Sequence, residues 1–102
     1  MLADALAHFD LMQEHAARGL HERLVLDAVC MRLSAGIEAL ANLDGETRSE
    51  LFGADWPLMW GLRNRIAHGY LLIDHQIIEA TLARDIPRIL PRMRQRTADS
   101  SP

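Results

Sequence analysis

The fold is indicated most clearly by residues 22–43, which read ERLVLDAVCMRLSAGIEALANL. Apolar side chains recur here at spacings of three and four residues, which is the repeat of one face of an α-helix. The repeating positions are Leu26, Val29, Cys30, Leu33, Ile37 and Leu40. This pattern predicts a long helix with one buried face. No segment of the chain shows the alternation of apolar and polar residues that is typical of β-strands.

A second apolar stripe lies over residues 2–18 and predicts a helix that ends at Gly19. Its apolar positions are Leu6, Phe9, Leu11, Met12 and Ala16. A short helix is expected over residues 46–52, before Gly53. Without an internal repeat or a linker, residues 1–96 are predicted to form one all-α domain, an antiparallel bundle of four to five helices. Residues 97–102 are expected to form a flexible polar tail.

Asp55 and Pro57 form a helix-start signal. A carboxylate can cap the first backbone N–H groups of a helix, and proline is tolerated in the first turn because an N–H there would have no acceptor within the helix. They predict a helix from about Trp56 to residue 67 or 68, which Gly69 is placed to end. At about 100° per residue, one side of this helix is apolar and is predicted to face the core. Its members are Leu58, Met59, Leu62 and Ile66.

Two further signals follow. Asp74 is predicted to cap a helix that continues through Leu82. Asp85 followed by Pro87 repeats the helix-start signal, so the chain is expected to bend there. Pro91 argues against one straight helix over residues 87–96, because a proline inside a helix removes a hydrogen bond and crowds the preceding turn.

The net charge of −3 is unevenly distributed. Residues 1–62 contain four arginines and ten acidic residues, whereas residues 63–102 contain seven arginines and four acidic residues. The cationic second half is either a solvated helix surface or a local field that attracts phosphate. Arg84, Arg88 and Arg92 are four residues apart and predict a ridge that contacts RNA or an acidic partner, with pairing to nearby acids as the alternative.

Cys30 is the single cysteine, and its apolar neighbours predict a buried thiol. No apolar run reaches the roughly 20 residues that span a bilayer, and the N-terminus does not resemble a signal peptide, so a cytoplasmic protein without membrane contact is expected. The histidines lack the spacing of metal ligands, and no metal or other cofactor is predicted.

The octapeptide RNRIAHGY, residues 63–70, carries the groups best suited to chemistry. The guanidinium of Arg63 can hold a phosphate with paired, charged hydrogen bonds. The imidazole of His68 can both accept and donate a proton near neutral pH. These groups suit RNA cleavage by the neighbouring 2′-hydroxyl, which needs no metal. Arg65 is a further possible contact to RNA or to a partner protein.

The geometry of an ideal helix separates these groups. Asn64 and His68 are one turn apart and share a face, whereas Arg63 and His68 diverge by about 140°. They meet at one phosphate only if the helix unwinds near Gly69 or if a second chain completes the site. A two-fold dimer would bring two copies of each group to one cleft and so supply both a base and an acid.

Trp60 and Ala67 lie on the side of this helix that is predicted to face away from the core. Tryptophan is enriched at subunit contacts, so this side is predicted to form the dimer interface. Two alternatives are packing of Trp60 inside the bundle and stacking of Trp60 on a nucleobase.

The octapeptide, with Asn directly after Arg and Tyr two residues after His, resembles the signature of the HEPN superfamily. More narrowly, it is similar to the HepT-like toxins of the MNT–HEPN toxin–antitoxin systems. The resemblance extends to residues 27–39, to YLLID at 70–74 and to DIP at 85–87, and it covers about two-thirds of the chain. The N-terminal part is short by comparison, so a truncated first helix is expected.

The resemblance implies an all-α homodimer whose paired motifs form a metal-independent endoribonuclease. In it, Arg63 binds the phosphate, Asn64 orients the site and His68 transfers protons. Tyr70 matches the tyrosine that a nucleotidyltransferase antitoxin modifies with AMP, which would block phosphate by charge and bulk. The implied partners are RNA and this antitoxin, in a homodimer or a higher hetero-oligomer of a type VII-like system. The alternative function is a non-catalytic helical subunit that binds or regulates the nucleotidyltransferase.

Overall fold

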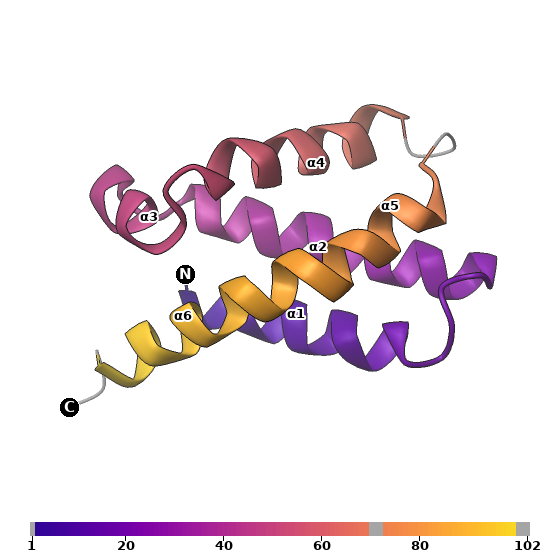
Figure 1. Ribbon diagram of the computed structural model, residues 1–102, viewed down its shortest axis with the longest axis horizontal. Helices are drawn as coiled ribbons and strands as arrows, with labels where there is room; N and C mark the ends of the chain where they lie inside the picture. The colour runs from indigo at the N-terminus through magenta and orange to yellow at the C-terminus, as the bar shows by residue number, and fades with distance from the viewer. Residues whose placement is uncertain (1, 70–72, 100–102) are drawn as a thin grey trace.

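The computed structural model describes residues 2–69 and 73–99. Helices α1 (Leu2–Ala16) and α2 (Arg23–Ala41) form an antiparallel pair, and the short α3 (Gly45–Phe52) leads into α4 (Asp55–Gly69). The remaining segments are α5 (His75–Ala80), the π-helical turn η2 (Thr81–Asp85) and α6 (Ile86–Asp99). Figure 1 shows these three as one continuous helical rod, residues 75–99, that crosses α1; we call it the α5–α6 rod. The predicted all-α bundle is confirmed.

The apolar face of α2 lies at the centre of the core, as its repeat predicts. Its buried residues are Val25, Leu26, Val29, Cys30, Leu33, Gly36, Ile37 and Leu40. Helix α1 buries Leu6, Phe9 and Met12 against it, as expected, whereas Leu11 and Ala16 are only partly buried. Within residues 2–69 and 73–99, no polar or charged residue is buried. The core is therefore held by apolar contacts, whose burial contributes roughly 1.5–3 kcal/mol for each large side chain.

Two predicted helix starts have different outcomes. Asp74 caps α5 as expected, because its Oδ1 accepts a hydrogen bond from the backbone N–H of Gln76 at 2.9 Å. Asp55, by contrast, is the first residue of α4 and not the residue that precedes it. Its carboxylate faces the α5–α6 rod, with Arg88 at 3.0 Å and Arg92 at 3.8 Å. The two cations occupy the oxygens that a capping residue would offer to the helix backbone.

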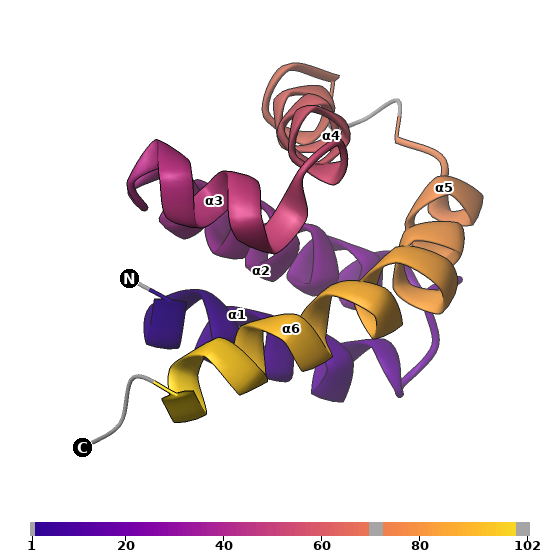
Figure 2. The same ribbon diagram turned by 60° about the vertical axis from the view of Figure 1, so that its left-hand side comes forward.

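The new helix start expected at Asp85 is wrong, because the helical path is continuous from His75 to Asp99. The path does change direction between α5 and α6 (Figure 2). In η2 the backbone N–H of Ile86 donates to the carbonyl of Thr81, five residues earlier. This wider turn leaves room for the ring of Pro87, which would crowd the preceding turn of a regular α-helix.

The break expected at Pro91 is also wrong, since Pro91 lies inside α6. A proline costs a helix interior about 3 kcal/mol. Four apolar side chains of α6 are buried against the bundle, and together they outweigh that cost. They are Ile86, Ile89, Leu90 and Met93. Residues 97–99 of the expected tail belong to α6, and residues 100–102 lie outside the described part of the chain.

Helix α4 packs mainly against α2 and α3 and stands away from the α5–α6 rod (Figure 2). Met59 and Ile66 are buried and Leu62 is half-buried, as the predicted core stripe requires. Leu58, the fourth member of that stripe, is 73% exposed, so its assignment to the core is wrong. The physical reason is that the buried face of α4 turns toward α2, which leaves the side that bears Leu58 open.

No helix in the described part of the chain combines the length and the apolar character needed to cross a bilayer.

The close approach of α1 and α2 requires Gly36. A Cβ atom built at this position would lie 2.5 Å from Cε1 of Phe9, whose ring is fully buried. We expect Gly36→Ala to lower the free energy of unfolding by about 1–3 kcal/mol through overpacking. Gly61→Ala is the matched control, because a Cβ there meets no atom within 4 Å and alanine favours a helix interior by about 1 kcal/mol. Urea denaturation measures both, and equal stability of the two variants would contradict the packing argument.

The thiol of Cys30 is confirmed as buried, and this burial raises its pKa from 9.0 to about 11, with a further contribution from the Asp27 carboxylate. Because the folded state holds the proton more tightly, the thiol's contribution to stability is complete below pH 9 and is lost as the pH rises toward about 11. Ellman's reagent at pH 8 should therefore modify Cys30 slowly in the native protein and rapidly in guanidinium. Similar rates in the two states would show that the thiol is accessible.

Candidate functional site

Arg63 is held in place by three neighbours. Its Nη1 donates to Oδ1 of Asn64 at 3.1 Å, and its Nη2 lies 3.5 Å from Oε2 of Glu38 on α2. Its guanidinium carbon lies 4.9 Å from the centre of the Trp60 ring. The Nε atom is buried and has no hydrogen-bond partner among the described residues. The guanidinium is thus oriented before any ligand binds, which lowers the entropic cost of binding an anion.

The tryptophans form a column along α4. Trp56 and Trp60 stack with ring centres 5.8 Å apart, and Phe52 continues the column at 6.3 Å from Trp56. Arg48 lies over Trp56 at 4.8 Å. Both tryptophans are half-buried and pack against the core. Part of their surface therefore serves the bundle, and the role of Trp60 and Ala67 in a dimer interface stays a prediction.

His68 lies on another side of the same helix. Since α4 remains helical through Gly69, the unwinding that could bring Arg63 and His68 together does not occur. His68 is exposed and lines a cavity of about 300 Å³ with Arg65, Gly69 and Ile73. Asn64 is one turn from His68, but its oxygen accepts from Arg63. A single chain therefore presents the guanidinium of Arg63 and the imidazole of His68 on different sides of α4.

Arg65 is the cation closest in sequence to His68. It is exposed and makes no hydrogen bond or ion pair with any residue that the structure describes. It remains available to an anionic ligand beside the imidazole. Tyr70, the predicted site of AMP addition, lies outside the described residues.

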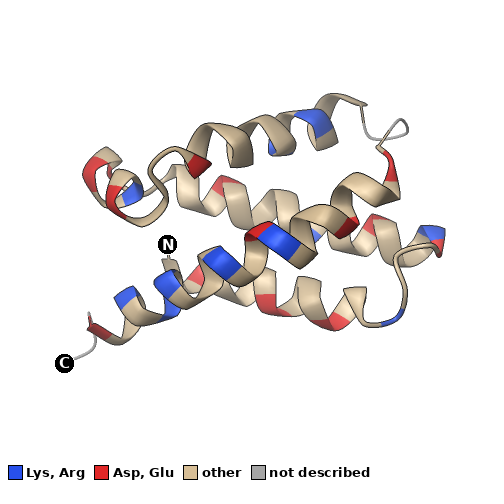
Figure 3. Ribbon diagram, viewed as in Figure 1, with Lys and Arg blue, Asp and Glu red and all other residues tan. Residues whose placement is uncertain are grey.

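The arginines of α6 run along the α5–α6 rod, next to acidic residues of neighbouring helices (Figure 3). Arg88 binds Asp55 at 3.0 Å and Asp85 at 3.3 Å. Arg92 donates to the carbonyl of Leu51 at 2.9 Å. These contacts match the alternative of pairing within the fold for Arg88 and Arg92. Arg84 is exposed and has no such contact among the described residues, and a role of the three in binding RNA or antitoxin stays a prediction.

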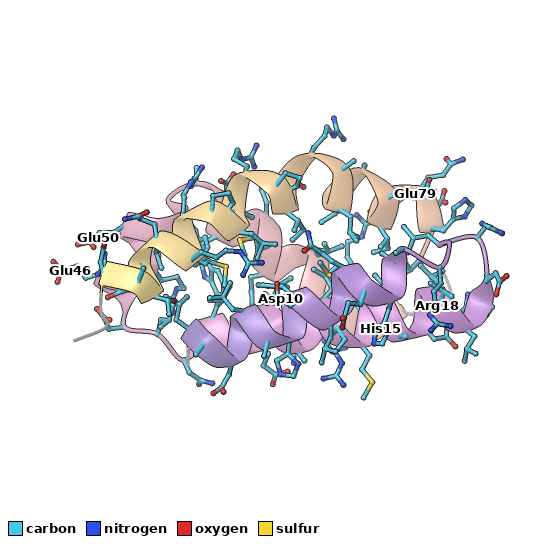
Figure 4. The ribbon with its side chains drawn as sticks, turned by 90° about the horizontal axis from the view of Figure 1, so that it is seen from below. Asp10, His15, Arg18, Glu46, Glu50 and Glu79 are labelled. Carbon is cyan, nitrogen blue, oxygen red and sulfur yellow. The ribbon has the colours of Figure 1, made fainter. Side chains whose placement is uncertain are left out.

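Two further ion pairs tie α6 to the rest of the bundle. Arg94 binds Asp10 of α1 at 2.6 Å, and Arg96 binds Glu50 of α3 at 2.8 Å. Figure 4 shows Asp10 near the middle of α1 and Glu50 at the end of the molecule formed by α3. Because these side chains are about half-exposed, each pair contributes at most about 1 kcal/mol. Much of the positive charge of the second half is thus neutralised at helix contacts.

The described residues contain no group of three or more histidine, cysteine, aspartate or glutamate side chains that is arranged to hold a metal ion.

A family model described as ribonuclease HepT-like matches residues 2–96. This chain belongs to the HepT-like family. It is a ribonuclease-type member of the HEPN superfamily, as the resemblance of its motif indicates. The comparison with curated proteins and the comparison with solved structures gave no match. The HepT-like match spans α1 through most of α6 and therefore includes every side chain of the site described above.

Sequence reasoning missed Glu38 as a part of the site. Its position on α2 places it opposite the buried stripe, which predicts exposure and agrees with its 59% exposed side chain. Nothing in the pattern of α2 shows that α4 brings Arg63 to this carboxylate. The pairing results from the crossing of two helices that are far apart in the sequence.

Proposed function

We propose that this protein is a metal-independent endoribonuclease that works as a homodimer. We further propose that it is the toxin of a type VII-like toxin–antitoxin system, in which a nucleotidyltransferase antitoxin silences it. The observation that carries the proposal is the guanidinium of Arg63, which Glu38, Asn64 and Trp60 hold in position within a HepT-like chain. A preoriented cation and a histidine carried by the same helix suit phosphodiester chemistry once a second chain brings the two groups together.

The proposed reaction needs two chains because Arg63 and His68 diverge on an unbroken helix. In a two-fold dimer, Arg63 binds the scissile phosphate while His68 of one subunit takes the proton from the 2′-hydroxyl. The 2′-oxygen bonds to phosphorus, the bond to the 5′-oxygen breaks, and His68 of the partner subunit protonates that leaving oxygen. The products are a 2′,3′-cyclic phosphate and a 5′-hydroxyl. Asn64 acts as a positioning residue, since it accepts a hydrogen bond from Arg63.

Silencing is proposed to occur at Tyr70. This residue is two positions after His68, so an AMP group on its phenol adds negative charge and bulk beside the proton-transfer group. Such a group excludes an RNA phosphate without unfolding the helix that carries the site.

The separation of Arg63 and His68 in one chain also supports a second candidate. If the two groups never meet, the protein serves as a helical subunit that binds or regulates a nucleotidyltransferase without cleaving RNA. The two candidates share one fold, so activity has to separate them.

Cleavage of RNA in the presence of EDTA tests the proposed enzyme. The wild-type dimer should cut a mixed RNA substrate, and His68→Ala should reduce the rate by at least about 100-fold, the usual contribution of a general acid or base. Arg63→Ala should cause a similar loss. His15→Ala is the matched control, because His15 lies on α1, away from α4 (Figure 4). Equal rates for wild type and His68→Ala would refute the ribonuclease proposal.

Substitution of Ala67 tests the proposed dimer interface. Ala67 is exposed, so Ala67→Arg leaves the fold intact but places a bulky charge on the predicted contact side. Light scattering should change from a dimer to a monomer mass, and RNA cleavage should fall with it. Trp60→Arg should do the same, although it also removes the ring beneath Arg63. Ala98→Arg, at an exposed position near the end of α6, is the control, and a dimer mass for Ala67→Arg would exclude this interface.

Intact-mass spectrometry tests the proposed silencing. Co-expression with a nucleotidyltransferase antitoxin should add one or more AMP units to the wild-type chain and none to Tyr70→Phe. The modified protein should lose RNA cleavage. AMP addition to Tyr70→Phe would show that another residue accepts the group.

A further inference from the structure

An apolar groove of about 570 Å³ lies between α4 and the α5–α6 rod. Its floor includes the buried side chains of Phe9, Leu33 and Ile37, and Leu58 of α4 stands at its edge with 73% of its surface exposed. Most of the lining residues belong to α4 and to the rod, whose courses can be followed in Figures 1 and 2. The volume falls within the roughly 300–1,000 Å³ of small-molecule and cofactor sites. The groove therefore opens a route from solvent to the core of the bundle.

The π-helical turn supports a binding role for this groove. Thr81 and Asp85, the first and last residues of η2, both line it. Single π-helical turns inside α-helices are rare and are found frequently at functional sites. The irregular segment of the rod thus forms part of the wall of the groove.

Arg65 connects the groove to the motif. It lines the groove and also lines the 300 Å³ cavity that contains His68. Arg65 and His68 are three residues apart on α4, which makes their side chains neighbours on the helix surface. The rim carboxylates Asp55 and Asp85 are both bound by Arg88. Arg88 therefore neutralises the two rim carboxylates, and the charged side chain at the end of the groove nearest His68 is the cation of Arg65.

We infer that the groove binds a nucleobase of the RNA, next to the phosphate that is cleaved. The inference rests on the proposed ribonuclease function and adds a second subsite to it. A nucleotide links a phosphate to a flat ring that loses little free energy on leaving water. The exposed guanidinium of Arg65 stands next to an apolar groove, so the two parts of the site match the two parts of a nucleotide. Arg65 is a positioning residue that holds the phosphate between the base and His68. An apolar peptide segment would fit the groove floor equally well. It would not explain why Arg65 lines both the groove and the cavity that contains His68.

Substitutions at exposed groove positions test the inference without disturbing the core. Gly61 lines the groove, and a Cβ there meets no atom within 4 Å, so Gly61→Phe should fold and fill the space. Gly61→Ala is its matched control. Leu58→Ser removes an exposed groove side chain, and Leu24→Ser is its control because Leu24 is 80% exposed on α2, outside the groove. Thermal denaturation by circular dichroism confirms that each variant is folded.

The measurement is fluorescence anisotropy with two uncleavable probes, a 2′-O-methyl oligonucleotide and an abasic oligonucleotide of the same length. Wild type should bind the base-containing probe about 10-fold more tightly than the abasic one, in line with the effect of stacking one base. Gly61→Phe and Leu58→Ser should remove this preference, whereas Gly61→Ala and Leu24→Ser should retain it. Arg65→Ala should weaken binding of both probes and lower the salt dependence.

These measurements test the nucleobase subsite and the ribonuclease proposal independently of each other. If wild type binds both probes equally, or if Gly61→Phe and Leu58→Ser keep the preference, the nucleobase subsite is refuted, whether or not RNA is cleaved. If the preference is present and depends on the groove but wild type cleaves no RNA, the subsite stands and the ribonuclease proposal falls. A third outcome would assign the groove to a protein partner. In that case the two probes bind equally well, and a peptide binds wild type but not Gly61→Phe or Leu58→Ser.

Discussion

The arrangement of this protein depends on the one-sided packing of α4. Met59 and Ile66 fix the helix against α2, and the turn after α3 fixes its start. The flank toward the α5–α6 rod is less closely packed, because the rod packs on α1 and α3 and is joined to the start of α4 by the Asp55–Arg88 ion pair. An α-helix that buries one stripe leaves the other sides to solvent or to a ligand. The exposed Leu58, the apolar groove and the accessible motif are all consequences of this packing.

The unbroken helix at the motif determines how the site can work. Arg63 turns toward α2, and its guanidinium is held by Glu38 of α2 and Trp60 of α4, while His68 turns toward the cavity that it shares with Arg65. The Glu38 carboxylate is more than half exposed, so its pair with Arg63 contributes little to stability. Its physical effect is to restrict the rotamers of a long side chain. A site that requires both groups must therefore be assembled from more than one chain.

The arginines of the second half fall into two groups in the structure. The guanidinium groups of Arg88, Arg94 and Arg96 bind carboxylates of other helices and join α6 to α4, α1 and α3. Arg65 has no such partner among the described residues, although it belongs to the same cationic half. Net charge alone does not distinguish a structural cation from one that is free to bind a ligand. The distinction depends on which carboxylates the fold brings within reach.

The sequence by itself determined the helices, the buried face of α2, the cap at Asp74 and the motif that identifies the family, because each depends on residues within a few turns of one another. It misjudged Asp55, Leu58, the helix start at Asp85 and the break at Pro91. These four depend on what packs against the helix: two arginines bind Asp55, no helix covers Leu58, and core burial with a π-helical turn keeps the α5–α6 rod continuous. Only the tertiary structure decided that Glu38 meets Arg63 and that a groove joins Arg65 to the core. Helical periodicity records which face of a segment is apolar, whereas the neighbour that each face meets is set by contacts between segments distant in the chain.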